Sequence, residues 1–210
     1  MSGAEVIGLI SGTIAIINAV TKVYDAVTDA SGLPEAFRDV AQRLPLIKDT
    51  LQTALAHLNT SSRDNRFYQA MMPVVDGCKD KATRLEKIFL KVIPQADSPR
   101  SERYVLAVRT LGKGSRVESL MKGMLEDLQL LAGNRMMKLA TEAQLGELAK
   151  AAEEVSAIPP SLLVEDPASG IHNYGSGPQN VNTGSGSQLN NNGGQLFVGG
   201  TFTGPFNFST

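Results

Sequence analysis

Charged residues stop abruptly at Asp166, and this break constrains the fold of the chain more than any other feature. Residues 1–150 hold all twenty Lys and Arg and seventeen of the 21 Asp and Glu, a net charge of about +3. The last 44 residues carry no charge, but they hold ten of the 20 glycines, seven asparagines and five of the eleven aromatic residues. Only the first part has the mixture of charged and apolar residues that surrounds a core with a solvated surface. The sequence therefore predicts two physically different segments.

The first segment begins with an uncharged stretch of fifteen residues, Val6 to Val20. We predict a helix over about 4–29, because apolar residues recur there at helical spacing. The residues that we expect on its broad apolar face include Val6, Leu9, Ile10, Ile17 and Val20. We predict that these five are the membrane-active residues if the helix is released from the bundle. Fifteen uncharged residues fall short of the roughly 20 that span a bilayer, so the helix is first a buried or interfacial one. The spacing of Gly8 and Gly12 suits close helix contact in lipid, or equally inside a bundle.

The remaining residues up to about 156 show helical periodicity with almost no strand signal. The further helices that we expect are about 34–58, kinked at Pro45, then 64–92, kinked near Pro73, then 101–111, 116–131 and 134–155. Short connections and charges between the apolar positions predict an all-α bundle of five or six helices that folds alone. We assign residues 1–156 to this domain, 157–168 to a linker and 169–210 to a tail.

Several classes of protein do not fit this composition. A single cysteine, Cys78, excludes a disulfide framework and a cysteine-based zinc site. The two histidines, His57 and His172, lie far apart, and no run of basic residues suits nucleic acid. The N-terminus lacks the positive start of a signal peptide, which indicates a cytoplasmic protein. We expect no metal or cofactor site and no nucleic-acid partner.

Enzymatic motifs are also missing. The segment Leu111–Ser115 contains Gly-Lys, but it lacks both the earlier glycine and the preceding strand of a phosphate-binding loop, so we interpret it as a turn. Glu126 and Asp127 are adjacent, so they point to different faces of a helix and are expected to be solvated charges. We therefore predict no catalytic residues.

The tail contains a nine-residue repeat. Asn173–Gln179 recurs as Asn182–Gln188, and a shortened copy follows as Asn191–Gln195. Such a tail is usually disordered, but a fixed register without charge also allows Asn and Gln ladders in stacked copies, as in cross-β amyloid. The predicted amyloid-motif residues are Asn173, Gly175, Gly177, Gln179, Asn182, Gly184, Gly186, Gln188, Asn191, Gly193, Gln195, Phe197, Phe202 and Phe206. We expect a disordered tail able to convert to cross-β amyloid.

Both segments resemble known fungal families. Residues 1 to about 130 or 150 resemble the SesA family, N-terminal domains on NACHT and other P-loop receptor-type NTPases of fungal cell-death pathways. The motifs that carry this resemblance are Glu5–Ser11, Lys22–Ala26, Gly32–Arg38 and Arg43–Leu46. The tail resembles the sigma-type amyloid signalling motif of fungal incompatibility systems. Its matching segments are His172–Gly177, Asn182–Gly186, Asn190–Gly193 and Gly199–Phe208.

This resemblance implies a non-enzymatic effector of programmed cell death. A NACHT- or NB-ARC-type receptor with a matching motif would template the tail, and the chain would then assemble with itself. The bundle, similar to HeLo and HeLo-like domains, would act on membrane lipids at the plasma membrane. No NTPase sequence lies within the 210 residues, which implies the effector role. The rival hypotheses are an adaptor whose bundle binds a partner, and a helical domain with an inert tail.

Overall fold

The computed structural model of the chain describes residues 3–162, apart from 28, 30, 61–63, 95–97, 113 and 134–139. The chain divides into two compact units, Met1–Leu163 and Val164–Thr210, and the second lies outside the described residues. The helices of the described part are α1 (Gly3–Asp25), α2 (Glu35–Ala41), α3 (Leu44–Thr60), α4 (Asn65–Val92), α5 (Arg100–Leu111), α6 (Val117–Ala132) and α7 (Glu142–Ser156). These described residues contain no strand, so the all-α prediction is confirmed for them.

Side-chain caps account for where α4 and α7 begin. Asp64 caps α4, because its carboxylate accepts a hydrogen bond from the backbone N–H of Phe67 at 2.8 Å. Thr141 and Gln144 form a capping box at the start of α7, in which each side chain binds the other residue's backbone N–H. Side chains thus satisfy backbone donors that a helix start leaves without partners.

The two predicted proline kinks have different outcomes. Pro73 lies inside α4, which continues through it as one helix. Pro45 instead lies in the first turn of α3, and α2 ends four residues earlier at Ala41. A proline costs least in a first helical turn, where its missing N–H would have no partner within the helix. The predicted kinked helix over 34–58 is therefore two helices, α2 and α3.

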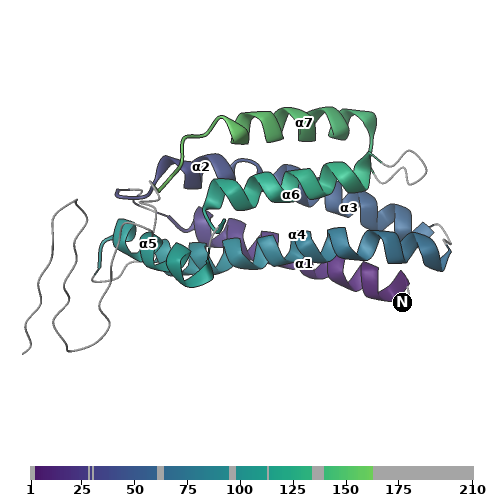
Figure 1. The fold of residues 1–210 in the computed structure, drawn as a ribbon, viewed down its shortest axis with the longest axis horizontal. Helices are drawn as coiled ribbons and strands as arrows, with labels where there is room; N and C mark the ends of the chain where they lie inside the picture. The colour runs from purple at the N-terminus through teal and green to yellow at the C-terminus, as the bar shows by residue number, and fades with distance from the viewer. Residues whose placement is uncertain are drawn as a thin grey trace, which may run out of the picture. The chain divides into compact units, whose positions relative to one another are not determined.

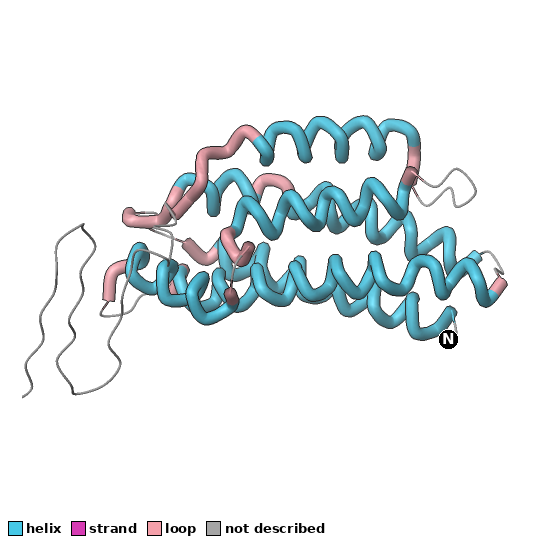
Figure 2. Tube along the Cα trace, in the orientation of Figure 1, coloured by secondary structure: helices cyan, strands magenta, loops and turns pink. Residues whose placement is uncertain are grey.

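The helices stack in layers around α4 and α6 (Figure 1). α4 packs against α1 on one side and α6 on the other, while α6 also contacts α7, α2 and α3. Figure 2, in the same orientation, shows the helices running mostly lengthwise through the described domain. Figure 1 places α1 and α7 at opposite edges, with α4 and α6 between them.

An aromatic cluster connects four of the helices. The ring of Tyr104 on α5 meets Phe37 on α2 edge to face, with centroids 5.0 Å apart. Phe37 lies 5.0 Å from Phe89 on α4, and Phe89 lies 6.2 Å from Tyr24 near the end of α1. Because Phe37, Phe89 and Tyr104 are fully buried, this cluster forms a continuous packed connection from α5 to α1.

Candidate functional site

The inward face of α1 is the face that helical spacing predicts. Val6, Ile10, Ile17 and Val20 are fully buried, and Leu9 is half-buried against the same core. They face α4 and α3, the two helices against which α1 packs. Each large apolar side chain removed from water contributes about 1.5–3 kcal/mol, so docking of α1 stabilises the resting bundle. The membrane role of these residues stays a prediction.

The opposite face of α1 is a strip of small residues open to solvent. We call Ala4, Gly8, Ser11 and Ala15 the outer strip; all four are exposed. A Cβ atom added at Gly8 would meet nothing within 4 Å, and one at Gly12 would come no closer than 3.8 Å to Lys79 Cε. The resting bundle therefore does not use the glycine spacing for close packing of helices.

The length and composition of α1 would also let it cross a membrane. Among the described residues it is the one helix that meets this criterion, which core helices of soluble proteins also meet. Only 28% of the residues in its most apolar 18-residue stretch are buried, however, whereas a core helix is mostly buried. The Thr13 and Thr21 hydroxyls donate to the carbonyls of Leu9 and Ile17 at 2.8 and 2.9 Å. These polar groups are therefore satisfied within the helix, as a lipid environment requires.

Charged residues mark the ends of this apolar stretch. Glu5 and Lys22 bracket sixteen uncharged residues, which span about 24 Å at about 1.5 Å per residue. The hydrocarbon core of a bilayer is about 30 Å thick, so the stretch is slightly short. A short span is accommodated when the bilayer thins locally or long side chains such as Lys22 reach the interface.

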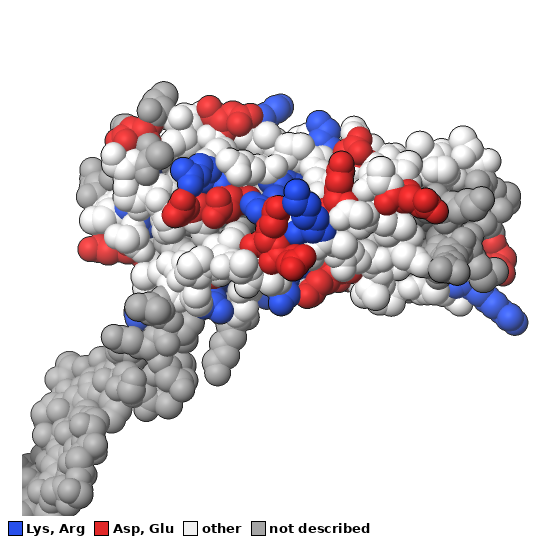
Figure 3. Space-filling view, turned by 90° about the horizontal axis from the view of Figure 1, so that it is seen from above, with Lys and Arg blue, Asp and Glu red and all other residues white. Residues whose placement is uncertain are grey.

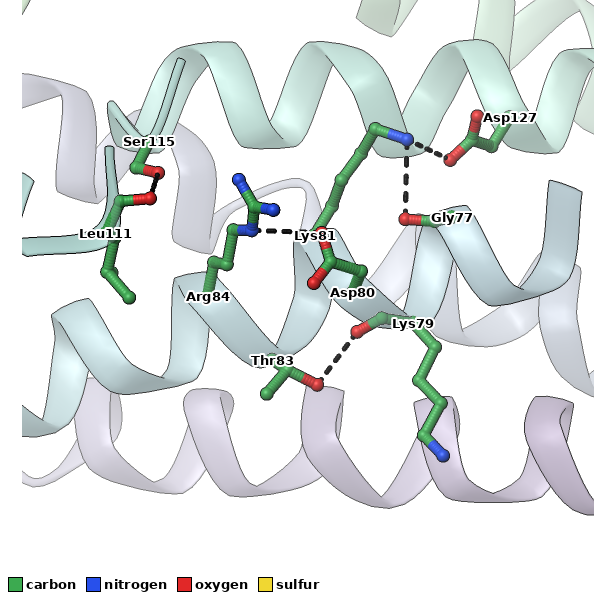
Figure 4. Close-up of polar contacts among 9 residues, drawn as sticks. All are labelled: Gly77, Lys79, Asp80, Lys81, Thr83, Arg84, Leu111, Ser115 and Asp127. Carbon is green, nitrogen blue, oxygen red and sulfur yellow. Dashed lines mark hydrogen bonds and ion pairs between the residues drawn. The ribbon is translucent and has the colours of Figure 1, made fainter. Parts of the chain in front are cut away.

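An ion pair fixes α4, the helix on which α1 rests, to α6. Figure 4 shows Lys81 reaching from α4 to Asp127, with 2.7 Å between Nζ and Oδ2. The Lys81 amine also donates to the carbonyl of Gly77 at 3.3 Å. A Cβ added at Gly123 would lie 2.6 Å from Lys81 Cε, so the missing side chain leaves room for the lysine stem. Burial raises the pKa of Asp127, and the hydrogen bond and charge of Lys81 oppose that shift.

The expectation that Asp127 is a solvated charge is therefore wrong. Its side chain is only 16% exposed. Its partner, Lys81, lies 46 residues earlier in the sequence, so the neighbouring Glu126 gave no indication of this contact. Glu126 itself is exposed and lies 3.9 Å from Lys122. Of these two residues, Asp127, on the inner side of α6, contacts another helix.

Cys78 and His57 lie in different surroundings on the described domain. Cys78 is buried on α4, and burial, followed by the negative charge of Asp127, raises the pKa of its thiol to about 12. His57 is exposed in the last turn of α3. No group of three His, Cys, Asp or Glu that could hold a metal occurs in the described ranges. The loop at Leu111–Ser115 joins two helices, and Gly112 and Gly114 adopt φ of 89° and 83° there.

Charges of both signs are interspersed on the face seen in Figure 3. In the described domain Glu154 lies 2.9 Å from Arg43 and 3.9 Å from Lys150. The mixed signs leave no large single-sign patch on this face for a highly charged partner.

All fourteen predicted amyloid-motif residues lie outside the described residues. Their role therefore stays a prediction. Sequence reasoning also missed a polar site formed by Tyr104, Glu118 and Ser161, whose side chains meet although they are up to 57 residues apart. No short motif announces it, because its residue types are common and its spacing is long.

Comparison with known families identifies both segments. Residues 10–131 match the family SesA, the N-terminal domain on NACHT-NTPase and P-loop NTPases. Residues 168–209 match a second family, the Sigma domain on NACHT-NTPases. Fold and matches together define a helical signalling domain of the kind associated with NACHT NTPases. The chain belongs to the SesA family, and the resemblance seen in its motifs is confirmed. No curated protein and no solved structure matches it.

Proposed function

We propose that the chain is a non-enzymatic effector of fungal programmed cell death that disrupts the plasma membrane after amyloid templating of its tail. The template is supplied by a NACHT- or NB-ARC-type receptor that carries a matching motif. At rest the chain is cytoplasmic with α1 docked, and after activation it is a homo-oligomer on lipid. The family association supports an NTPase-type partner.

The observation that carries the membrane step is the asymmetry of α1. Its inner face is buried, but its outer strip already faces water without a charge between Glu5 and Lys22. In a bilayer the inner face would keep an apolar environment, and the outer strip would offer the small residues at which transmembrane helices associate. α1 is therefore suited to two environments, whereas the charged outer faces of later helices suit only water.

Crowding supplies a physical link between tail assembly and release of α1. Stacked chains in cross-β repeat every ~4.8 Å. A bundle of several helices, each about 10 Å across, is at least ~20 Å wide. Bundles attached to successive layers therefore collide unless their tethers fan them apart. The resulting strain favours release of the least polar helix into lipid.

A seeded leakage assay tests this function. Dye-loaded vesicles containing anionic and neutral lipids receive the full-length chain, with or without preformed fibres of a synthetic 168–210 peptide. We expect dye release only when the seeds are present, together with conversion of the full-length tail detected by thioflavin fluorescence.

The alternative functions predict different results. An adaptor would convert its tail on the seeds but release no dye, and a chain with an inert tail would show neither change. Dye release without tail conversion would contradict the templating step. Conversion without release, over the range of lipid compositions, would contradict the membrane step.

A further inference from the structure

The segment after α7 is held to the bundle by a cluster of polar contacts around Ser161. After α7 ends at Ser156, Ser161 reaches the start of α6, where its N–H donates to Glu118 Oε1 at 3.1 Å. The Ser161 hydroxyl donates to Glu118 Oε2 at 2.6 Å, and its oxygen lies 2.6 Å from the Tyr104 hydroxyl. The Tyr104 oxygen in turn accepts from the N–H of Val117 at 3.1 Å. Tyr104 is thus left to donate to Ser161, and both hydroxyls donate and accept once.

The receiving side of this site is buried. Tyr104 is fully buried and Glu118 is 6% exposed. Arg116 lies 3.5 Å from Glu118 and also donates to the Leu162 carbonyl at 3.4 Å. We call Ser161 and Leu162, held by Tyr104, Arg116 and Glu118, the latch. When the latch opens, a buried carboxylate loses two hydrogen-bond donors, so opening is resisted and weakens its surroundings.

Apolar packing holds this segment only weakly. Pro159 and Pro160 are exposed, while Ile158 and Leu162 are only partly buried. A hollow of about 160 Å³ lies beside the segment, lined on one side by Ile158 and Pro160 and on the other by the first turns of α6. Hydrogen bonds lose their strength over a short displacement, so a pull on the tail would open the latch in one step.

The latch also determines the length of the tether. When it is closed, six residues, 163–168, separate it from the predicted tail, a reach of at most about 20 Å. When it is open, the tether begins after Ser156 and comprises twelve residues, a reach of at most about 40 Å. Chains that stack every ~4.8 Å therefore gain space if the latch opens.

We propose that the latch is an autoinhibitory clasp: tail assembly pulls it open, and the aromatic cluster transmits this opening to α1. This inference rests on the proposed function, and it names the place where tail assembly would act on the bundle. The ring of Tyr104 belongs to both structures, because it contacts Phe37, which leads through Phe89 to Tyr24 on α1. Loss of the Ser161 contact leaves the Tyr104 hydroxyl with the hydrogen bond from Val117 N–H but without its acceptor, which loosens the ring at one end of that cluster.

Hydrogen–deuterium exchange of the full-length resting protein tests the latch without any membrane. The variant Ser161→Ala removes the shared hydroxyl, and Tyr104→Phe removes its partner but keeps the ring. The matched control is Ser156→Ala, because that hydroxyl only donates to the carbonyl of Ala152 within α7. Ser161→Ala removes a hydrogen bond to the Glu118 carboxylate, and Tyr104→Phe removes the contact with Ser161 and leaves the Val117 N–H without its acceptor. We expect both latch variants to raise exchange about tenfold or more in residues 157–162 and in the last turns of α1.

The outcomes separate this inference from the proposed function. If both latch variants show the same exchange in α1 as the Ser156→Ala control, the autoinhibitory role of the latch is wrong, even if the wild-type protein releases dye. Faster exchange at 157–162 alone would overturn the coupling to α1 and with it the inference. If exchange rises in both places but no protein releases dye from seeded vesicles, the clasp stands and the membrane function fails. In the leakage assay we expect Ser161→Ala to shorten the lag after seeding.

Discussion

Placing negative charges on the outer strip should separate folding of the bundle from its action on membranes. Ser11 and Ala15 are exposed, are one helical turn apart, and lie near the middle of the stretch between Glu5 and Lys22. Glutamates at both positions would face water in the resting protein but hydrocarbon in a spanning helix. Charges at Ile10 and Ile17 would not separate the two effects, because those side chains are fully buried in the bundle.

The expected energies differ strongly between the two states. In the bundle, exposed substitutions usually change stability by less than about 0.5 kcal/mol, and two like charges one turn apart cost about 0.2–0.5 kcal/mol. In the bilayer, an ionised side chain near the centre of a spanning helix costs about 2.5–3.5 kcal/mol by insertion scales. The pair thus costs about 5–7 kcal/mol, which lowers the inserted population by a factor of several thousand or more.

The assay compares this variant with a matched pair of charges elsewhere. Gln52→Glu with Ala56→Glu places the same charges one turn apart on the exposed side of α3. Both double variants should melt within a few degrees of the wild type by circular dichroism, and both should convert their tails on 168–210 seeds. Only Ser11→Glu with Ala15→Glu should lose dye release. If that variant is folded, converts and still releases dye at the control rate, α1 is not the membrane-active element.

Further predictions concern the tail, the tether and the α4–α6 contact. Lysine at Gln188 or Asn182 should slow fibre assembly, measured by thioflavin fluorescence, because like charges would stack in every layer; an unchanged rate would exclude ladders there. Twelve Gly and Ser residues inserted after Val164 should reduce dye release per converted chain, because a longer tether relieves crowding; equal release would contradict the crowding mechanism. Cys78, whose pKa is raised to about 12, should react with iodoacetamide at pH 8 only as fast as the bundle opens, and rapid labelling of native protein would contradict its burial. Because folding raises the pKa of Asp127, the folded state binds this proton more tightly, so the stability of the wild type relative to Asp127→Asn should increase as pH falls from neutral towards 4 in urea titrations; a decrease would contradict the shift.

The local sequence was sufficient to predict a helix and its buried face where apolar spacing and capping residues determine them. The inward face of α1 followed from the recurrence of Val6, Ile10, Ile17 and Val20, because apolar periodicity and burial have the same geometric origin. Pro45 shows the limit of that reasoning, since a proline signals an interruption but does not say whether a helix bends or restarts.

Contacts between distant residues could not be predicted in the same way. The Lys81–Asp127 pair depends on how α4 lies against α6, and a lysine 46 residues from an aspartate carries no signal. The latch joins Ser161 to residues 43 and 57 positions earlier, through side chains that occur in every protein. Packing decides such pairs, and a single sequence records it only indirectly.

The separation of α1 from α7 bears on activation in the absence of tail assembly. The tail follows α7, whereas α1, the helix that we propose acts on the membrane, lies at the opposite edge, beyond α6 and α4 (Figure 1). We expect fraying at the C-terminal edge that leaves the latch closed to leave α1 docked, because local openings at the low-stability end of a domain do not extend to its packed core. A brief collision between two tails that does not open the latch would likewise leave α1 docked. Under the proposed function, the layered order of the helices would keep α1 docked in a cell where no tails assemble.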